Sequence, residues 1–198
     1  MLRFAALVLV FAATVGFSSN ADATTIKFRA SLDGPSENPP VPSAGTGEAL
    51  VIYDDVAHTL QVEVDWQDLT GTTTVAHIHC CVDPPGTIGV ATFPGTFPGF
   101  PAGVMAGTYS GSWSLDDTAS YTAGFLASFG GGTAPGAEAA LVAGILDGRA
   151  YVNIHTSFAP GGEIRGFLQQ VPEPGTLGLF LLGMIGVVSR RRGRNAIS

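Results

Sequence analysis

Charged residues are scarce in this sequence, and cations are scarcer than anions. Charged side chains make up 13% of the 198 residues, with 9 lysines and arginines against 16 aspartates and glutamates. Globular proteins usually carry about 25% charged residues, and coiled coils and charge-driven disordered segments carry more. A nucleic-acid-binding surface also needs clustered lysine and arginine. The composition therefore excludes a coiled coil and a charge-driven disordered chain, and it argues against nucleic acid as a partner.

Several catalytic and ligand-binding motifs are also missing. The sequence has no Gly-x-Ser-x-Gly nucleophile elbow, no glycine-rich phosphate loop and no twelve-residue aspartate-rich calcium loop. Lys27 is the only lysine. Asp54-Asp55 and Asp116-Asp117 are predicted to form solvated turns, and His58, beside the first turn, is predicted to be solvated as well. We therefore predict that the protein is not an enzyme.

Residues 1–23 have the features of a secretory signal peptide. Arg3 precedes an apolar run from Phe4 to Phe17, and Ala21-Asp22-Ala23 has the small-x-small pattern that signal peptidase cleaves. The run is shorter than the about 20 residues that a membrane-spanning helix needs. We predict export and cleavage after Ala23, and an uncleaved N-terminal membrane anchor is the alternative.

Residues 171–198 form a tail with three parts. Val171-Pro172-Glu173-Pro174 comes first, then an apolar stretch from Thr176 to Val188, then a basic cluster of Arg190, Arg191, Arg192 and Arg194. Proline ends a preceding strand because it lacks an amide proton, and a basic cluster stays on the cytoplasmic side of a membrane. The apolar stretch can span a bilayer only marginally. We predict transient anchoring in the membrane, and a permanent anchor is the alternative.

This tail resembles the PEP-CTERM sorting signal of Gram-negative bacteria, in which a Pro-Glu-Pro motif, a short apolar helix and an arginine cluster follow one another. The resemblance implies cleavage near Pro172 to Pro174 by an exosortase, an integral-membrane cysteine protease. It also implies a bacterium that makes exopolysaccharide and forms biofilms or flocs. We therefore expect signal peptidase and exosortase as partners during export, and a location on the outer cell surface or in the extracellular matrix.

Residues 24–170, which remain between the two ends, have the pattern of an antiparallel β domain. In Thr59–Trp66 apolar and polar residues alternate, as in a half-buried strand. Further candidate strands are Thr25–Leu32, Glu48–Tyr53, Thr73–His79, Thr108–Leu115, Ala150–His155 and Glu163–Gln169. About seven short strands predict an all-β fold, a Greek-key or immunoglobulin-like β-sandwich. The domain is acidic, so it should repel an anionic polysaccharide unless a divalent cation bridges the two.

Two segments depart from the strand pattern. Ala137–Leu146 is predicted to form one short helix. Residues 82–107 are rich in proline and glycine and repeat a Phe-Pro unit at Phe93, Phe97 and Phe100. We expect a stiff loop whose phenyl rings fold onto the sandwich, and a loop that binds protein or carbohydrate is the alternative.

Three of the four histidines form a candidate metal site. His77 and His79 alternate along a predicted strand, so their imidazoles project from one face, about 6 to 7 Å apart. Such a pair can hold one Cu or Zn ion if His155 approaches from a neighbouring strand, with Glu163 or Asp83 as a further ligand. The alternative is that the imidazoles pack against aromatic rings and bind carbonyls without a metal.

Cys80 and Cys81 are adjacent. Thiols of an exported protein are expected to be oxidised, yet neighbouring cysteines can bond only through a strained eight-membered ring. A vicinal disulfide, intermolecular disulfides and free thiolates beside the histidine pair are all compatible with the sequence. We favour the vicinal disulfide.

Three stretches, taken in order, resemble the CHRD domain, which is named for repeats in the animal BMP antagonist chordin. They are Phe28-Arg29-Ala30-Ser31-Leu32-Asp33-Gly34 with Glu37-Asn38-Pro39-Pro40, Ala76-His77-Ile78-His79, and Tyr151-Val152-Asn153-Ile154-His155-Thr156 with Gly161-Gly162-Glu163-Ile164-Arg165-Gly166. The resemblance implies a β-sandwich module of extracellular or matrix proteins, without established catalytic activity. Within it, Glu163 and Arg165 are expected to pair with Asn153 or His155 in a buried polar seam.

These observations predict a non-enzymatic, structural or binding protein of the cell surface or biofilm matrix. Matrix polysaccharide or protein is the expected partner, and no cofactor is established. A Cu- or Zn-binding, redox-active envelope protein that uses His77, His79 and His155 is the alternative.

Overall fold

The computed structural model describes residues 25–172. The predicted cleavage site Ala23 and the tail residues Glu173, Pro174, Arg190, Arg191 and Arg192 lie outside the described residues, so their roles stay predictions. Within the described range, no helix has the length and apolar character needed to cross a membrane.

All seven predicted strands are present, and the last is divided in two. The strands are β1 (Thr25–Asp33), β2 (Thr46–Asp54), β3 (Thr59–Gln67), β4 (Thr73–Cys80), β5 (Gly107–Ser114), β6 (Ala150–Thr156), β7 (Ile164–Phe167) and β8 (Gln169–Gln170). The division falls at Leu168, whose side chain is buried and whose N–H donates to Ala150 O. β7 pairs with β6 and, at Arg165, with β1, whereas β8 pairs with β1.

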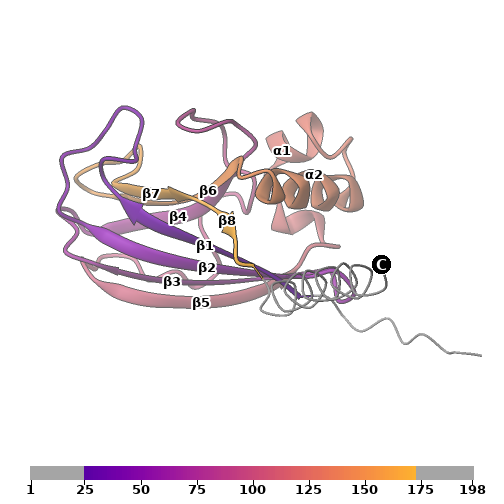
Figure 1. The fold of residues 1–198 in the computed structure, drawn as a ribbon, viewed down its shortest axis with the longest axis horizontal. Helices are drawn as coiled ribbons and strands as arrows, with labels where there is room; N and C mark the ends of the chain where they lie inside the picture. The colour runs from indigo at the N-terminus through magenta and orange to yellow at the C-terminus, as the bar shows by residue number, and fades with distance from the viewer. Residues whose placement is uncertain (1–24, 173–198) are drawn as a thin grey trace, which may run out of the picture.

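The strands form a curled antiparallel sheet in the order β4-β6-β7-β1-β2-β3-β5, with β8 paired to β1. In Figure 1, β4, β6 and β7 lie in one layer and β2, β3 and β5 in the other, with β1 leading from one to the other. Each strand pair of the described chain is antiparallel. The predicted all-β fold of sandwich type is confirmed.

Alternation places the core between the two layers. On β3, Leu60, Val62, Val64 and Trp66 are buried, while the residues between them are half-buried or exposed. β1 and β2 contribute their own alternate apolar residues, and β4 and β6 contribute Ala76, Ile78, Val152 and Ile154. Removing these side chains from water is the main favourable contribution to folding.

The helices lie together at one end of the sheet (Figure 1). α2 (Ala134–Leu146) begins three residues before the predicted start, because Thr133 Oγ1 caps it by accepting from Gly136 N at 3.2 Å. Its residues Leu141 and Ile145 are buried in the core. α1 (Ala123–Ser128) and a 3₁₀ turn at Thr118–Ser120 were not predicted, since each is only one or two turns long.

The proline-rich loop packs on the sheet as expected. Phe97 is fully buried, and its ring stacks on Tyr109 at 5.6 Å and on Trp113 at 5.5 Å between ring centroids. Phe100 stacks on Trp66 at 5.0 Å. The loop also bonds to β4, where Phe97 N donates to Ala76 O at 3.0 Å. It therefore covers the β4 edge of the sheet.

β4 and β6 are consequently buried on both faces. Every residue of β6 is buried, although only alternate residues face the apolar core. The opposite face of these strands carries polar side chains, and they are shielded by loops instead of by a second sheet. The candidate site lies on this face.

Candidate metal centre

His77, His79 and His155 come together on the loop-covered face of β4 and β6. His77 and His79 project from the same side of β4, as their spacing predicts. His155 lies opposite Val75 on β6, diagonal to His77. The three rings lie 5.1 to 5.9 Å apart between centroids, and each residue is less than 10% exposed.

Each imidazole is oriented by one backbone carbonyl. The bonds are His77 Nε2 to Gly95 O at 2.6 Å, His79 Nδ1 to Ile88 O at 2.7 Å, and His155 Nδ1 to Pro160 O at 2.8 Å. A carbonyl oxygen can only accept, so the bonded nitrogen carries the proton in each ring. The tautomer of all three neutral rings is thereby determined.

The second nitrogen of each ring has a free lone pair. His77 Nδ1, His79 Nε2 and His155 Nε2 are buried and have no hydrogen-bond partner. The three side chains offer ligand atoms that all lie within 4.8 Å of one another. Three nitrogens bound to one ion at about 2.0 Å would stand about 3.5 Å apart, so the rings would have to move closer together to coordinate one ion.

The electrostatic environment keeps the rings neutral. Burial lowers the pKa of His77 and of His155 below the ordinary histidine value. Burial also lowers the pKa of His79 to about 4, with smaller contributions from the neighbouring histidines and Arg165. Neutral imidazole is the form that coordinates metals, so the three side chains are available as ligands at neutral pH.

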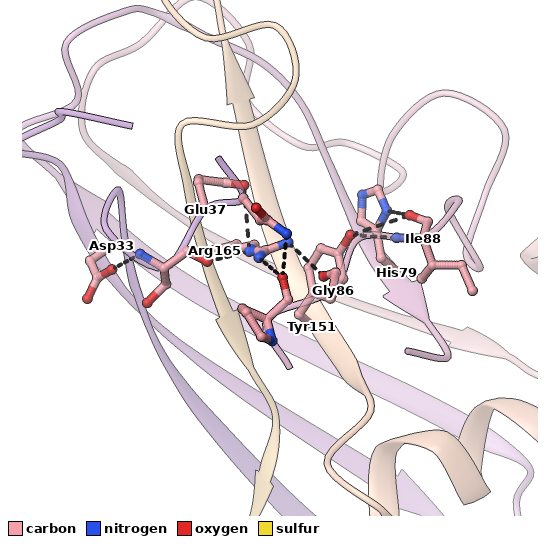
Figure 2. A network of polar contacts seen from close by, with 10 residues as sticks. Asp33, Glu37, His79, Gly86, Ile88, Tyr151 and Arg165 are labelled. Atoms are coloured by element: carbon pink, nitrogen blue, oxygen red, sulfur yellow. Dashed lines mark hydrogen bonds and ion pairs between the residues drawn. The ribbon is translucent and has the colours of Figure 1, made fainter. Parts of the chain in front are cut away.

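Behind His79 lies a buried polar network (Figure 2). Tyr151 stacks on His79 with ring centroids 4.7 Å apart and planes 5° apart. Arg165 lies over the Tyr151 ring, with its Cζ 4.8 Å from the ring centroid. The guanidinium is fully buried and donates to the carbonyls of Ser36, Pro85 and Gly86. Its nearest anion is Glu37, with Oε2 3.7 Å from Nε.

The two further ligands suggested by the sequence lie elsewhere. Glu163 is not part of the histidine group: it accepts hydrogen bonds from Ser43 Oγ, Thr156 Oγ1 and the N–H groups of Thr70 and Gly71. Asp83 pairs with Arg149 at 2.8 Å. The expected lateral pair of Arg165 with Asn153 is present in the register of β7 and β6, although the Arg165 side chain donates to loop carbonyls. The Glu163 carboxylate bonds to Ser43, Thr70, Gly71 and Thr156 instead of to Asn153 or His155.

Cys80 and Cys81 are joined as a vicinal disulfide, with their Cα atoms 3.1 Å apart. It ends β4 and packs closely on Gly144 of α2, where an added Cβ would collide with both sulfur atoms. The two sulfurs are bonded to each other, so they are not thiolates that could bind a metal ion together with the neighbouring histidines.

A second group contains His58, which is paired and not simply solvated as expected. His58 Nδ1 lies 2.9 and 3.0 Å from the carboxylate oxygens of Glu138 on α2. Glu138 also accepts from Tyr53 Oη at 2.7 Å. Asp116 completes a second candidate group with His58 and Glu138, but His58 and Glu138 already bond to each other, and the His58 side chain is 46% exposed.

Sequence reasoning did not find the atoms that orient the site. The three carbonyls belong to Ile88, Gly95 and Pro160, and a carbonyl has the same chemistry in any residue type. Tyr151 and Arg165 were within the motifs noted above, but their stacking behind His79 depends on the β4–β6–β7 register. A partial signal is the density of glycine and proline in the covering loop.

Comparison with known proteins places the chain in a family. Residues 28–168 match the CHRD domain, and residues 170–192 match the PEP-CTERM protein-sorting motif. No curated protein and no solved structure matches the chain significantly. The sorting motif marks an exported protein that exosortase processes and that is displayed at the cell surface or outside the cell. Because the first match spans more than half of the sequence, the chain belongs to the CHRD-domain family.

Proposed function

We propose that this exported surface protein binds one copper or zinc ion through His77, His79 and His155. The observation that carries the proposal is the set of three buried, unpartnered imidazole nitrogens gathered on one face of β4 and β6. Each ring donates its only proton to a carbonyl, an arrangement that orients histidine ligands in metal sites. Imidazole suits copper and zinc, whereas Ca²⁺ and Mg²⁺ require oxygen ligands.

A purely structural polar seam is the competing interpretation, and it explains the site less well. In such a seam the buried polar atoms would bond to one another, as Glu163 does with its four donors. A buried acceptor without a partner costs about 1–3 kcal/mol, and this site collects three of them. An ion that accepts all three lone pairs would recover that cost.

The proposed role is binding and not catalysis. A protein of the cell surface or extracellular matrix that holds a metal ion behind buried ligands can sequester that ion. The burial of the ligands, each less than 10% exposed, favours retention of the ion over rapid exchange. We therefore propose a non-enzymatic surface or matrix protein whose specific ligand is a transition metal.

Isothermal titration of the metal-free protein with Cu(II) and Zn(II) tests the proposal. We expect one ion per chain with a dissociation constant below micromolar, and a loss of at least about 100-fold for His77→Gln or His155→Gln, since each removes one of three ligands. His58→Gln is the matched control, because it removes a histidine outside the group. Equal binding by His77→Gln and the unmodified protein would show that the metal lies elsewhere.

A further inference from the structure

The ligands of the candidate centre carry no negative charge. All three are neutral imidazoles, and each is backed by a carbonyl instead of a carboxylate. A carboxylate partner would give the imidazole anionic character, and a carbonyl gives much less. A bound dication would therefore keep both of its charges in a buried site, which is unfavourable, whereas a monocation would keep one.

The number of ligands points in the same direction. Among residues 25–172, the group around this site contains only the three histidines, because Glu163 and Asp83 are engaged elsewhere. Cu(II) prefers a tetragonal arrangement, for which this site offers too few ligands, whereas Cu(I) has a filled d shell and three nitrogens are enough to bind it. Zn(II) also has a filled d shell and can complete three histidines with a water, so the selection against zinc depends on its second charge.

A buried cation adds a positive potential. Arg165 lies on Tyr151, and Tyr151 lies on His79, so one aromatic ring separates the guanidinium from a ligand. Figure 2 shows this succession of Arg165, Tyr151 and His79. Repulsion between two cations in a poorly solvated site grows with the charge of the metal ion. Arg165 therefore opposes a dication twice as strongly as a monocation.

The only carboxylate beside Arg165 in the contacts of the described chain compensates this charge incompletely. Glu37 Oε2 lies 3.7 Å from Arg165 Nε, and Glu37 Oε1 is buried without a partner. Burial raises the pKa of Glu37 to about 7, although Arg165 acts in the opposite direction. Near pH 7, Glu37 is therefore neutral in a fraction of the molecules, and in those molecules the Arg165 guanidinium has no carboxylate charge beside it.

We propose that the His77, His79 and His155 centre is selective for Cu(I) over Cu(II) and Zn(II), with Arg165 as the positioning charge behind Tyr151. This inference rests on the proposed metal-binding function and goes beyond it by naming the oxidation state. A consequence is that the centre would raise the Cu(II)/Cu(I) reduction potential above that of copper in water.

The selectivity can be measured with the purified full-length protein. Anaerobic competition with bicinchoninate, with ascorbate as reductant, gives the affinity for Cu(I), and competition with chelators of Cu(II) and Zn(II) gives the other two. We expect Cu(I) to bind at least about tenfold more tightly than either dication, because the dications carry the additional charge. Cyclic voltammetry of the copper-bound protein gives the potential.

Glu37→Gln separates the electrostatic explanation from the ligand geometry. It removes the anion beside Arg165 and keeps the shape of the side chain. At pH 8.5, Glu37 is ionised in the unmodified protein, so the Glu37→Gln variant should bind every metal ion less tightly than the unmodified protein does. Because Coulomb energy is proportional to charge, the fold-loss for Cu(II) or Zn(II) should equal the square of that for Cu(I). Glu48→Gln, an equal charge change on the exposed face of β2, should leave all three affinities unchanged.

The outcomes distinguish the inference from the function on which it rests. If Cu(II) or Zn(II) binds as tightly as Cu(I), selectivity is refuted while metal binding stands. Equal fold-losses for all ions in Glu37→Gln refute the role of Arg165. If no ion binds, or if His77→Gln binds as well as the unmodified protein, both proposals fail. Should Glu37→Gln prove unfolded by circular dichroism, the comparison of ions in the unmodified protein still decides selectivity.

Discussion

At the scale of residues, the candidate centre depends on groups that never touch the ion. The carbonyls of Ile88, Gly95 and Pro160 determine which nitrogen of each histidine is free. Gly95 has a φ of +118°, a conformation that L-residues avoid because of their Cβ atom and that glycine adopts readily. The loop uses this glycine to direct its carbonyl at His77. Partners of this kind commonly change metal affinity by about 10- to 100-fold.

Gly95→Ala is therefore expected to weaken metal binding by about tenfold, because relief of the strained φ turns the carbonyl away from His77. Gly99→Ala is a matched control in the same loop, because Gly99 also has a positive φ, +77°, and an added Cβ would meet no atom within 4 Å at either glycine. Among the described contacts, Gly99 makes no hydrogen bond to a ligand histidine, whereas Gly95 does. Both variants should lose a similar amount of stability, about 1–2 kcal/mol. Equal metal affinities of the two variants would contradict the role of Gly95.

At the scale of elements, α2 buries Leu141 and Ile145 in the core and makes two further contacts with the strands and their turns. The vicinal disulfide at the end of β4 packs on Gly144, and the turn between β2 and β3 pairs with Glu138 through His58. The predicted Asp54-Asp55 turn is present, and Asp54 Oδ1 accepts from the N–H groups of Val56 and Ala57 at 3.0 and 2.8 Å. The turn thus delivers His58, at φ +49°, to the helix.

This second contact should depend on pH. The hydrogen bond and charge of Glu138 raise the pKa of His58 above its ordinary value. A raised folded-state pKa stabilises the protein fully below the unfolded value of about 6.5, and this contribution is lost as pH rises through the folded value. In urea unfolding with a chelator present, His58→Gln should therefore cost more stability at pH 6 than at pH 9. A cost that is the same at both pH values would show that the pair does not contribute.

At the scale of the whole molecule, both ends of the described chain lie at the same end of the sheet. β8 pairs antiparallel with β1, with Gln170 opposite Phe28, and Val171 N donates to Lys27 O at 2.8 Å. The match to the sorting motif begins at residue 170, within β8, so it overlaps the last strand of the sheet. Only residue 169 separates it from the CHRD match, which ends at residue 168.

A chain that ends at Leu168 should be less stable than one that ends at Pro172 by about 1–3 kcal/mol, because the β8 hydrogen bonds to β1 are lost at about 1 kcal/mol each. Thermal or urea unfolding gives the difference. Replacing both Gln169 and Gln170 by Ala is the control, since it removes exposed side chains and keeps the backbone bonds, and it should cost less than about 0.5 kcal/mol. If truncation is harmless, β8 is not a structural part of the domain.

Across these scales, local patterns were sufficient for the strands and insufficient for the site. Thr59–Trp66 alternates so regularly that only one face can be buried, and the structure buries it. α1 was missed because six residues cannot show helical periodicity. Glu163 is a possible further ligand by residue type, but the chain reverses between β6 and β7 and turns its carboxylate towards Thr70 and Gly71.

Local residue patterns predict the β-rich architecture, and they put His77 and His79 on a single side of their strand, because side-chain direction alternates within any extended chain. It is the folded arrangement that brings His155 to them, leaves one nitrogen of each ring free and puts Arg165 behind the group. Those features arise from strand register and from carbonyls of distant loops. Contacts of this kind depend on the positions of atoms far apart in the chain, and no local pattern of residues encodes them.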